Sequence, residues 1–298
     1  MALPLLRFAR RAPLEILYNV LQTVRGMTDL GQRAFIRHLL ADDESKDDQR
    51  IIASLTTLPD RIATIKPTID SLLQQTRVPD EIVVVVPEFS LRQQRRYDIP
   101  EFLAAMPRVR ILRTEKDSGP ATKFIPIIQE EKAAGRNDTL IMVADDDRTY
   151  PRDSVALYRY YSRRLPDAAF CFRGGAMPRG RQWHHVKIIF GNNIREPQRV
   201  AVMSGCGSYL IRPRFFDESL WDYAGAPRGA FYMDDIWIAG CLDRRGVKKY
   251  VIPSAQMMRT VIRQTATMNL YEVPKGRRAS NNDTIAFFEK TWNVFPPD

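Results

Sequence analysis

From Ile51 onward, the chain alternates short apolar runs with amphipathic helical segments. Between the first two runs, apolar residues recur at helical spacing from Ile62 to Leu73, and Pro67 predicts a kink or a restart of that helix. Nearly continuous apolar runs are typical of parallel strands that are buried on both faces of a sheet. The alternation therefore predicts an α/β fold with right-handed crossovers between parallel strands. The runs that carry this prediction are Ile51 to Leu55, Ile82 to Val86, Val109 to Leu112 and Leu140 to Val143.

The second half of the chain has a less regular pattern. Pro151 is suited to open a helix whose apolar positions include Val155 and Tyr158. No repeat, low-complexity tract or linker follows position 50, so residues 49–298 are expected to form one domain with halves at 49–150 and 151–298. The candidate strands of the second half are Ala168 to Phe172, Val200 to Met203, Ser208 to Ile211 and Tyr250 to Ile252.

The first 40 residues differ in composition from the rest. Apolar residues recur at helical spacing from Leu14 to Val24, and again from Phe35 to Leu40, among many arginines. The acidic run from Asp42 to Asp48 indicates a solvated linker. We expect residues 1–48 to form a basic amphipathic helical extension, which either packs on the domain or lies on an anionic membrane surface.

Charge and cysteine usage limit the partners and the compartment. The chain has 45 Lys and Arg against 35 Asp and Glu, a net charge of +10 that favours polyanionic partners. The positive charge is scattered and no nucleic-acid-binding module is present, so nucleic acid is not an expected partner. Three widely spaced cysteines indicate reduced thiols, and neither a signal peptide nor a transmembrane segment is apparent. These features predict a cytoplasmic protein with peripheral membrane contact at most.

Three consecutive aspartates follow the apolar run that ends at Val143. In open α/β sheets, ligands bind beyond the carboxyl ends of the strands, where these acids are expected. Alternate side chains of an extended chain share a face, so Asp145 and Asp147 point to one side and Asp146 to the other. Two carboxylates on one side favour a divalent cation such as Mn²⁺ or Mg²⁺, whose shell phosphate oxygens and water complete. Capping of the helix near Pro151 explains one acid but not three.

The segments around these acids resemble a known family. SLTTLPDR after the first strand, DSGPATKF, VADDD, SGCGSYLIRPRFFD, DDIWIAGCL and GVKKYVIP together are similar to GT-A fold glycosyltransferases, with DDIWIAGCL resembling the acidic-pair helix of glycosyltransferase family 2. The same segments resemble the exostosin-type family, in which a basic residue at the position of Lys123 precedes the triple aspartate. The resemblance implies a GT-A, Rossmann-like fold, with a mixed, mainly parallel sheet flanked by helices. Residues 49–150 would then be the nucleotide-binding half and residues 151–298 the acceptor-binding half.

The resemblance also implies roles for individual residues. Asp147 would ligate the metal, and Asp145 would contact the ribose or base of a nucleotide-sugar. An arginine after the first strand can grip phosphate, and a lysine can stabilise the leaving diphosphate. The donor-binding residues implied in this way are Thr56, Thr57, Arg61, Lys123, Asp145 and Asp146.

A second acidic pair, Asp234 and Asp235, opens a predicted helix, where acids can also simply satisfy the helix N-terminus. The resemblance implies that these two are the catalytic residues, with Asp235 as the general base that accepts the proton of the acceptor hydroxyl. In a retaining enzyme, the same residue would lie near the anomeric carbon without acting as the base, so inversion and retention both stay open. The expected acceptor-binding residues are Gly205, Gly207, Ser208 and Trp237.

The expected activity is transfer of a single sugar from a nucleotide-diphosphate sugar, with UDP as the commonest base of the family, to a hydroxyl of a glycan or glycolipid. The QxxRW signature of processive polysaccharide synthases is missing. Two alternatives are a sugar nucleotidyltransferase, which normally shows a GGxGxR loop after the first strand, and an inactive scaffold of the same fold that binds glycan or membrane. The retention of Asp145, Asp147 and Asp235 favours the enzyme.

Overall fold

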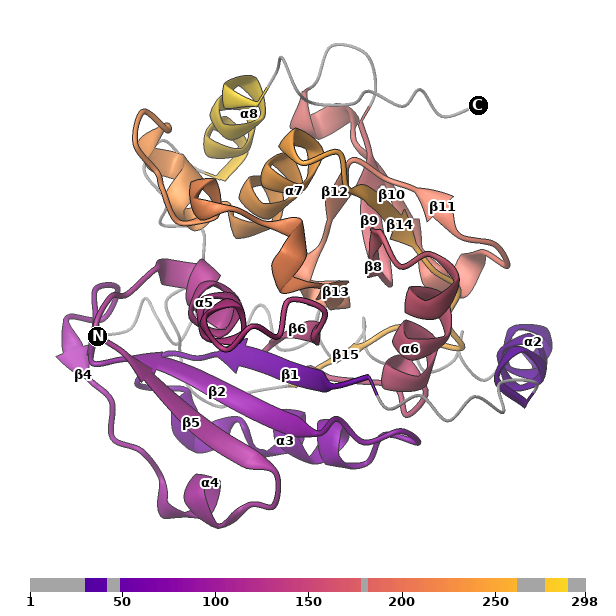
Figure 1. Ribbon diagram of the computed structural model, residues 1–298, viewed down its shortest axis with the longest axis horizontal. Helices are drawn as coiled ribbons and strands as arrows, with labels where there is room; N and C mark the ends of the chain where they lie inside the picture. The colour runs from indigo at the N-terminus through magenta and orange to yellow at the C-terminus, as the bar shows by residue number, and fades with distance from the viewer. Residues whose placement is uncertain (1–29, 42–48, 178–181, 262–276, 289–298) are drawn as a thin grey trace, which may run out of the picture.

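A mixed sheet of eight strands forms the centre of the computed structural model (Figure 1). The structure describes residues 30–41, 49–177, 182–261 and 277–288. In spatial order the strands are β11 (Gln198–Arg199), β14 (Lys248–Val251), β8 (Ala168–Cys171), β13 (Tyr209–Ile211), β6 (Leu140–Asp145), β1 (Ile51–Thr56), β2 (Glu81–Pro87) and β5 (Val109–Thr114).

The first half of the chain supplies the parallel part of this sheet. Strands β6, β1, β2 and β5 are paired in parallel, as their apolar runs predict. The second half adds β13, which is antiparallel to both β6 and β8, whereas β14 is parallel to β8. The mixed, mainly parallel sheet expected from the sequence is therefore confirmed.

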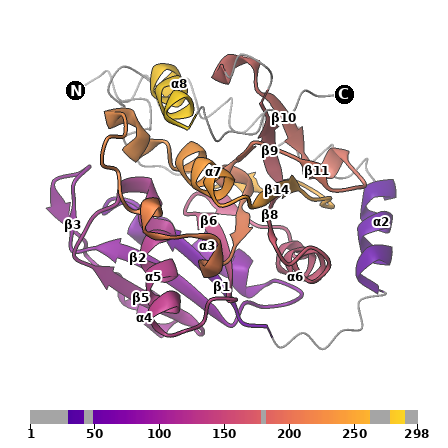
Figure 2. The ribbon, with the colours of Figure 1, turned by 45° about the horizontal axis from the view of Figure 1, so that its top comes forward.

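Helices cover both faces of the sheet because successive strand residues point to opposite sides. Ile52 packs in a core beneath α5 (Ile125–Ala133), α7 (Asp234–Arg244) and α8 (Arg277–Phe287). Its neighbour Ile51 packs in the core of the other face. That second core is covered by α2 (Leu30–Ala41), α3 (Lys66–Leu73), α4 (Glu101–Ala105) and α6 (Ser154–Arg164), and the two layers are visible in Figures 1 and 2.

Smaller elements extend the second half. The antiparallel sheet β10 (Lys187–Phe190), β9 (Arg173–Ala176) and β12 (Val202–Met203) was not expected, and it takes only the end of the predicted strand from Val200. β15 (Arg259–Thr260) pairs with β7 (Arg148–Thr149) and so brings a late segment beside the triple aspartate. The remaining hairpin joins β3 (Phe89–Ser90) to β4 (Arg95–Arg96).

Short 3₁₀ turns account for much of the irregular sequence. The predicted break at Pro67 appears as a 3₁₀ turn η1 (Ile62–Thr64) followed by α3, and the helix after Pro151 begins at Ser154. The other turns are η2 (Gly119–Lys123), η3 (Trp183–His185), η4 (Gly191–Asn193), η5 (Gly205–Gly207), η6 (Pro213–Phe215), η7 (Glu218–Leu220) and η8 (Arg228–Tyr232).

The N-terminal helix α2 is docked on the domain. The buried amide of Gln32 donates to the carbonyl oxygens of Ile194 (2.8 Å) and Ser254 (3.2 Å), and Ile36 is 1% exposed. This helix matches the second helical stretch predicted for the extension, while the first, around Leu14 to Val24, lies outside the described residues. Among the helices of the described ranges, none is long and apolar enough to cross a bilayer.

Candidate functional site

The candidate site lies at the carboxyl edge of the central strands. β1 and β6 end side by side, with Thr56 opposite Asp145 in the parallel register. The turn η5 packs on the end of β6, and the first turn of α7 brings two further carboxylates to the same place. Residues from both halves of the chain therefore meet at one edge of the sheet (Figure 1).

Lys123 is the cation at the centre of these acids. Its carbonyl oxygen accepts a 2.6 Å hydrogen bond from Ser54 on β1, which fixes η2 against the sheet. The ammonium is 2.8 Å from Asp145 Oδ1 and 2.8 Å from Asp234 Oδ2, and the residue is only 6% exposed. Burial alone lowers the pKa of Lys123, but the surrounding carboxylates hold that pKa well above its ordinary value. The lysine is thus permanently charged.

Asp145 is held as a charged carboxylate. Burial raises its pKa, but the ammonium of Lys123, together with Arg148 and Arg61, holds the net pKa below its ordinary value. Its backbone is fixed by Tyr150, whose hydroxyl accepts from the Asp145 N–H at 2.7 Å. One quarter of the Asp145 side chain, 26%, is exposed. This carboxylate is open to a ligand while it neutralises the buried lysine.

Asp146 holds the loop after β1 through its hydrogen bonds. Its carboxylate accepts from the hydroxyl of Thr57 at 2.5 Å and from Arg61 Nη1 at 3.3 Å. Its carbonyl oxygen accepts from Thr68 of α3 at 2.9 Å. Thr57 and Arg61, both expected at the donor, are thereby tied to the middle aspartate. The hydroxyl of Thr56 donates to the carbonyl of Val85 on β2 at 2.8 Å.

Asp147 has the most exposed side chain of the triplet, at 33%. Its Oδ1 is 3.3 Å from Arg148 Nε. Burial and the nearby carboxylates Asp145 and Asp146 raise the pKa of Asp147, against the opposite effect of Arg148. A cation bound beside Asp147 would offset the repulsion from these two carboxylates.

Asp234 and Asp235 begin α7, and their environments differ. Asp234 is 7% exposed and paired with Lys123. Asp235 Oδ1 accepts a 2.8 Å hydrogen bond from the backbone N–H of Gly205. Burial and the charge of Asp234 raise the pKa of Asp235 to about 7, although Lys123 and the Gly205 N–H lower it. Asp235 therefore exchanges a proton near neutral pH.

Gly205 lies where the two acidic groups and the lysine meet. A Cβ at this position would be 2.9 Å from Asp235 Oδ1, 3.0 Å from Lys123 Nζ and 3.4 Å from Asp145 Oδ1. Only a glycine leaves the three charged groups in their present positions. The close approach of these groups to the backbone explains why residue 205, which was predicted to bind the acceptor, is a glycine.

The other predicted acceptor residues lie away from these groups. A Cβ at Gly207 would meet Arg173 of β9 at 2.6 Å, so this glycine serves the packing of η5. Ser208 is 0% exposed and its hydroxyl accepts from Tyr158 at 3.2 Å. Trp237 is also 0% exposed, with its indole N–H donating to the carbonyl of Leu220 at 2.8 Å. No face of Trp237 is available to a sugar in this arrangement.

Four residues that the sequence did not single out contribute to the site. Tyr150 fixes the backbone of Asp145, and the buried hydroxyl of Tyr209 lies in the field of Lys123. Arg148 and Arg173 both approach Cys206 of η5, and Arg148 also adds positive charge beside the triplet. Arg148 could have been found, since it follows the triplet directly. The other three come from elements whose placement depends on the fold.

A divalent metal fits the donor set of this site in part. Asp145 and Asp147 offer two hard oxygen ligands, and burial, followed by the charges of Asp145 and Asp146, raises the pKa of Asp147. Among the described residues, no group of three or more His, Cys, Asp or Glu side chains is arranged to hold a metal. Two carboxylates suit Mg²⁺ or Mn²⁺ when phosphate oxygens and water supply the remaining ligands.

No known protein family matches the sequence, and no curated protein matches it. Among solved structures, the chain is similar to GalNAc-T7 with UDP, GalNAc and Mn²⁺ (TM-score 0.49, 15% identity, 74% of this chain and 45% of that chain). It is similar to S. aureus TarS 1–349 (0.42, 12%, 72% and 60%). It is also similar to 4-diphosphocytidyl-2C-methyl-D-erythritol synthase (0.44, 13%, 73% and 95%). The chain thus spans less than two thirds of the first two structures.

Proposed function

We propose that this protein is a metal-dependent GT-A fold glycosyltransferase that moves one sugar from a nucleotide-diphosphate sugar, a UDP-sugar in the first instance, to a hydroxyl of a glycan or glycolipid. The observation that carries the proposal is the meeting of two acidic groups around Lys123 and Gly205. One group, at the end of β6, is suited to a metal-bound diphosphate, and the other, at the start of α7, holds a carboxyl with a pKa of about 7.

Donor binding is assigned to the end of β6. Asp145 and Asp147 would hold Mn²⁺ or Mg²⁺, which neutralises the charge of the diphosphate when it is bound. Arg148, whose Nε is 3.3 Å from Asp147 Oδ1, would supply positive charge for a phosphate bound there. Asp146 keeps Arg61 and Thr57 in place through its hydrogen bonds, so its part in donor binding is to shape the loop.

Proton transfer is assigned to Asp235. Its carboxylate would take the proton of the acceptor hydroxyl as that oxygen bonds to the anomeric carbon, while the bond from that carbon to the diphosphate breaks. A general base works best when its pKa is near the working pH, as the pKa of about 7 for Asp235 allows. The Gly205 N–H orients this carboxylate, and the ammonium of Lys123, paired with Asp145, would add positive charge beside a bound diphosphate.

The test is an assay of UDP-sugars that measures released UDP and pyrophosphate separately, with Mn²⁺, with Mg²⁺ and with a chelator. We expect metal-dependent release of UDP, whereas release of pyrophosphate from UTP and a sugar phosphate would indicate nucleotidyl transfer instead. Asp235→Asn should lower kcat by roughly 10²–10⁴-fold, the usual contribution of a general base. Asp147→Asn should abolish activation by metal.

Asp70→Asn is the matched control for both variants. Asp70 is an aspartate on α3 that, within the described part of the chain, forms its ion pair with Lys66, one turn away. We expect it to keep full activity and metal dependence. Turnover that is independent of metal, or Asp235→Asn and Asp147→Asn variants that behave like Asp70→Asn, would overturn the proposal.

A further inference from the structure

A cavity of about 590 Å³ lies at the opposite edge of the sheet, beside the amino ends of β2 and β5. It is bounded by α2, by the loop between α3 and β2, by the turn before β5 and by α6. Asp80 and Arg108, which directly precede β2 and β5, line its floor. The cavity is therefore separate from the site at the carboxyl edge.

Arginines dominate the lining of this cavity. They come from four different parts of the chain, and two carboxylates of the described residues, Asp80 and Asp153, accompany them. Asp80 is already engaged, since its Oδ2 accepts from the Ile51 N–H at 2.8 Å and lies 3.5 Å from Arg159 Nη2. The lining arginines are Arg37, Arg77, Arg108, Arg159 and Arg163.

Three of these arginines have no acidic partner within the described part of the chain. Arg37, Arg77 and Arg108 are exposed and make no ion pair there. Arg159, by contrast, is 9% exposed and donates to the carbonyl of Gln49 at 2.7 Å. The cavity thus combines one fixed, buried guanidinium with three that are available to a ligand.

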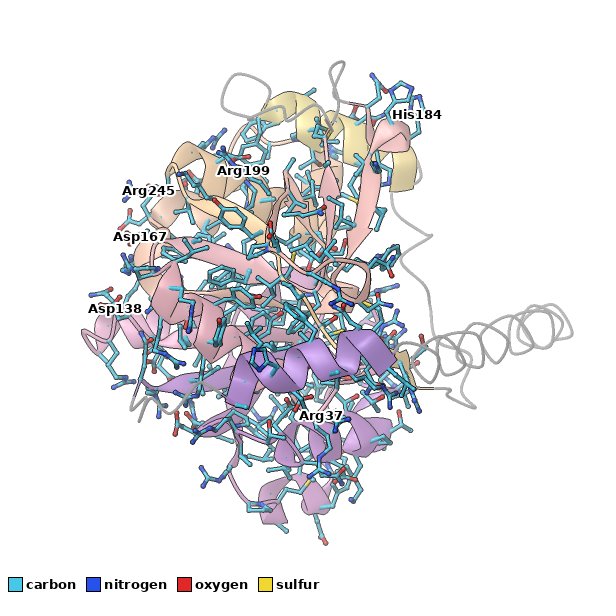
Figure 3. The ribbon with its side chains drawn as sticks, turned by 90° about the vertical axis from the view of Figure 1, so that its right-hand side faces the viewer. Arg37, Asp138, Asp167, His184, Arg199 and Arg245 are labelled. Carbon is cyan, nitrogen blue, oxygen red and sulfur yellow. The ribbon has the colours of Figure 1, made fainter. Side chains whose placement is uncertain are left out.

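The wall formed by α2 is held in place by contacts outside the cavity. Gln32 and Ile36 anchor this helix on the domain. Arg37, Leu40 and Ala41 are spaced three and four residues apart, so they share the helix face that lines the cavity. In Figure 3, Arg37 lies along the lower side of α2, towards the elements of the first half of the chain.

We propose that this cavity, which we name the arginine pocket, binds a phosphate-bearing anion. Guanidinium groups bind phosphate oxygens in pairs, and several of them around one concave surface favour a ligand with more than one negative charge. The same chemistry is offered by the headgroup of an anionic phospholipid and by a soluble phosphate compound. The proposal does not depend on the activity assigned to the carboxyl edge.

The test compares two double variants with equal loss of charge. Arg37→Gln with Arg77→Gln removes two exposed guanidiniums of the arginine pocket. The control, Arg199→Gln with Arg245→Gln, removes two exposed arginines from a different region of the surface, labelled in Figure 3. Thermal melts of all three proteins verify that the exposed substitutions leave the fold intact.

Two binding measurements distinguish the sources of the phosphate. Calorimetry with inorganic pyrophosphate measures the soluble ligand, and sedimentation with phosphatidylglycerol vesicles, against phosphatidylcholine vesicles, measures the lipid headgroup. We expect the pocket variant to weaken binding by roughly tenfold in at least one measurement, with the control changed much less. Loss in the vesicle measurement identifies a lipid headgroup, and loss with pyrophosphate alone identifies a soluble ligand. Equal behaviour of the two variants in both measurements would overturn the proposal.

Discussion

Both edges of the central sheet hold cationic side chains, but these differ in burial and in pairing. At the carboxyl edge, the ammonium of Lys123 is buried between Asp145 and Asp234 at 2.8 Å from each. At the amino edge, Arg37 and Arg77 are exposed and have no acidic partner among the residues described. Buried, paired charges are fixed in position and change the pKa of their neighbours, whereas exposed charges attract an ion from solution without being held in place. The first arrangement suits chemistry and the second suits binding.

The largest expected effect comes from a comparison of the free energies of unfolding of the Lys123→Met and Arg77→Met variants. Removal of Lys123 leaves Asp145 and Asp234 without a buried partner, and we expect the free energy of unfolding to fall by about 3–5 kcal/mol. Removal of the exposed Arg77 should leave it nearly unchanged. Urea denaturation of both variants at neutral pH is the measurement, and equal losses would remove the distinction between the edges.

Gly205→Ala should lower the activity of the site at the carboxyl edge by displacing its charged groups, without changing any charge. The added Cβ would lie 2.9 Å from Asp235 Oδ1 and 3.0 Å from Lys123 Nζ, so both groups must move. We expect kcat to fall by roughly 10²-fold, because small displacements of reacting groups are costly. Gly31→Ala on the exposed surface of α2 is the control and should keep its kcat. An active Gly205→Ala variant would show that these groups need not be held so closely.

The pKa of Asp235 makes a prediction about stability as well as rate. Its pKa is raised from 3.8 to about 7 in the folded protein, so the protonated form stabilises the fold and this contribution is lost as the pH rises through about 7. The Asp235→Asn variant does not lose this contribution, because the asparagine side chain does not titrate. The variant should gain stability relative to the wild type between about pH 4 and pH 7, as urea titrations across this range would measure. A constant difference would contradict the raised pKa.

Gln32→Ala tests how much the buried hydrogen bonds of α2 contribute to the stability of the amino edge. The buried amide of Gln32 satisfies carbonyl oxygens of Ile194 and Ser254, and unsatisfied buried acceptors cost about 1–3 kcal/mol. We expect a loss in this range and faster hydrogen exchange in α2. Gln74→Ala, an exposed change at the end of α3, is the control. An unchanged exchange rate would mean that the apolar contacts of α2, which include Ile36, dock the helix without the amide of Gln32.

The regular parts of the fold could be predicted because their physics is local. A strand that is buried on both faces of the sheet needs apolar side chains at successive positions, as in Ile82 to Val86. These apolar runs form the parallel strands. The second half was harder, because its strands are short and its 3₁₀ turns leave no periodic signal. The three-stranded sheet of β9, β10 and β12 depends on glycines such as Gly174, whose Cβ would meet the Val202 carbonyl at 2.8 Å. That contact exists only in the folded chain.

The triple aspartate shows the same division within the candidate site. The sequence by itself determined that three carboxylates follow a buried strand. The alternation that it predicted for their side chains does not extend past Asp145, because β6 ends there and Asp146 and Asp147 form a turn. Only the tertiary structure placed Lys123 and Asp235 beside them and buried Trp237, since these residues reach the edge or the core through η2 and α7. The raised pKa of Asp235 likewise arises from burial and neighbouring charge, which are properties of packing rather than of residue order.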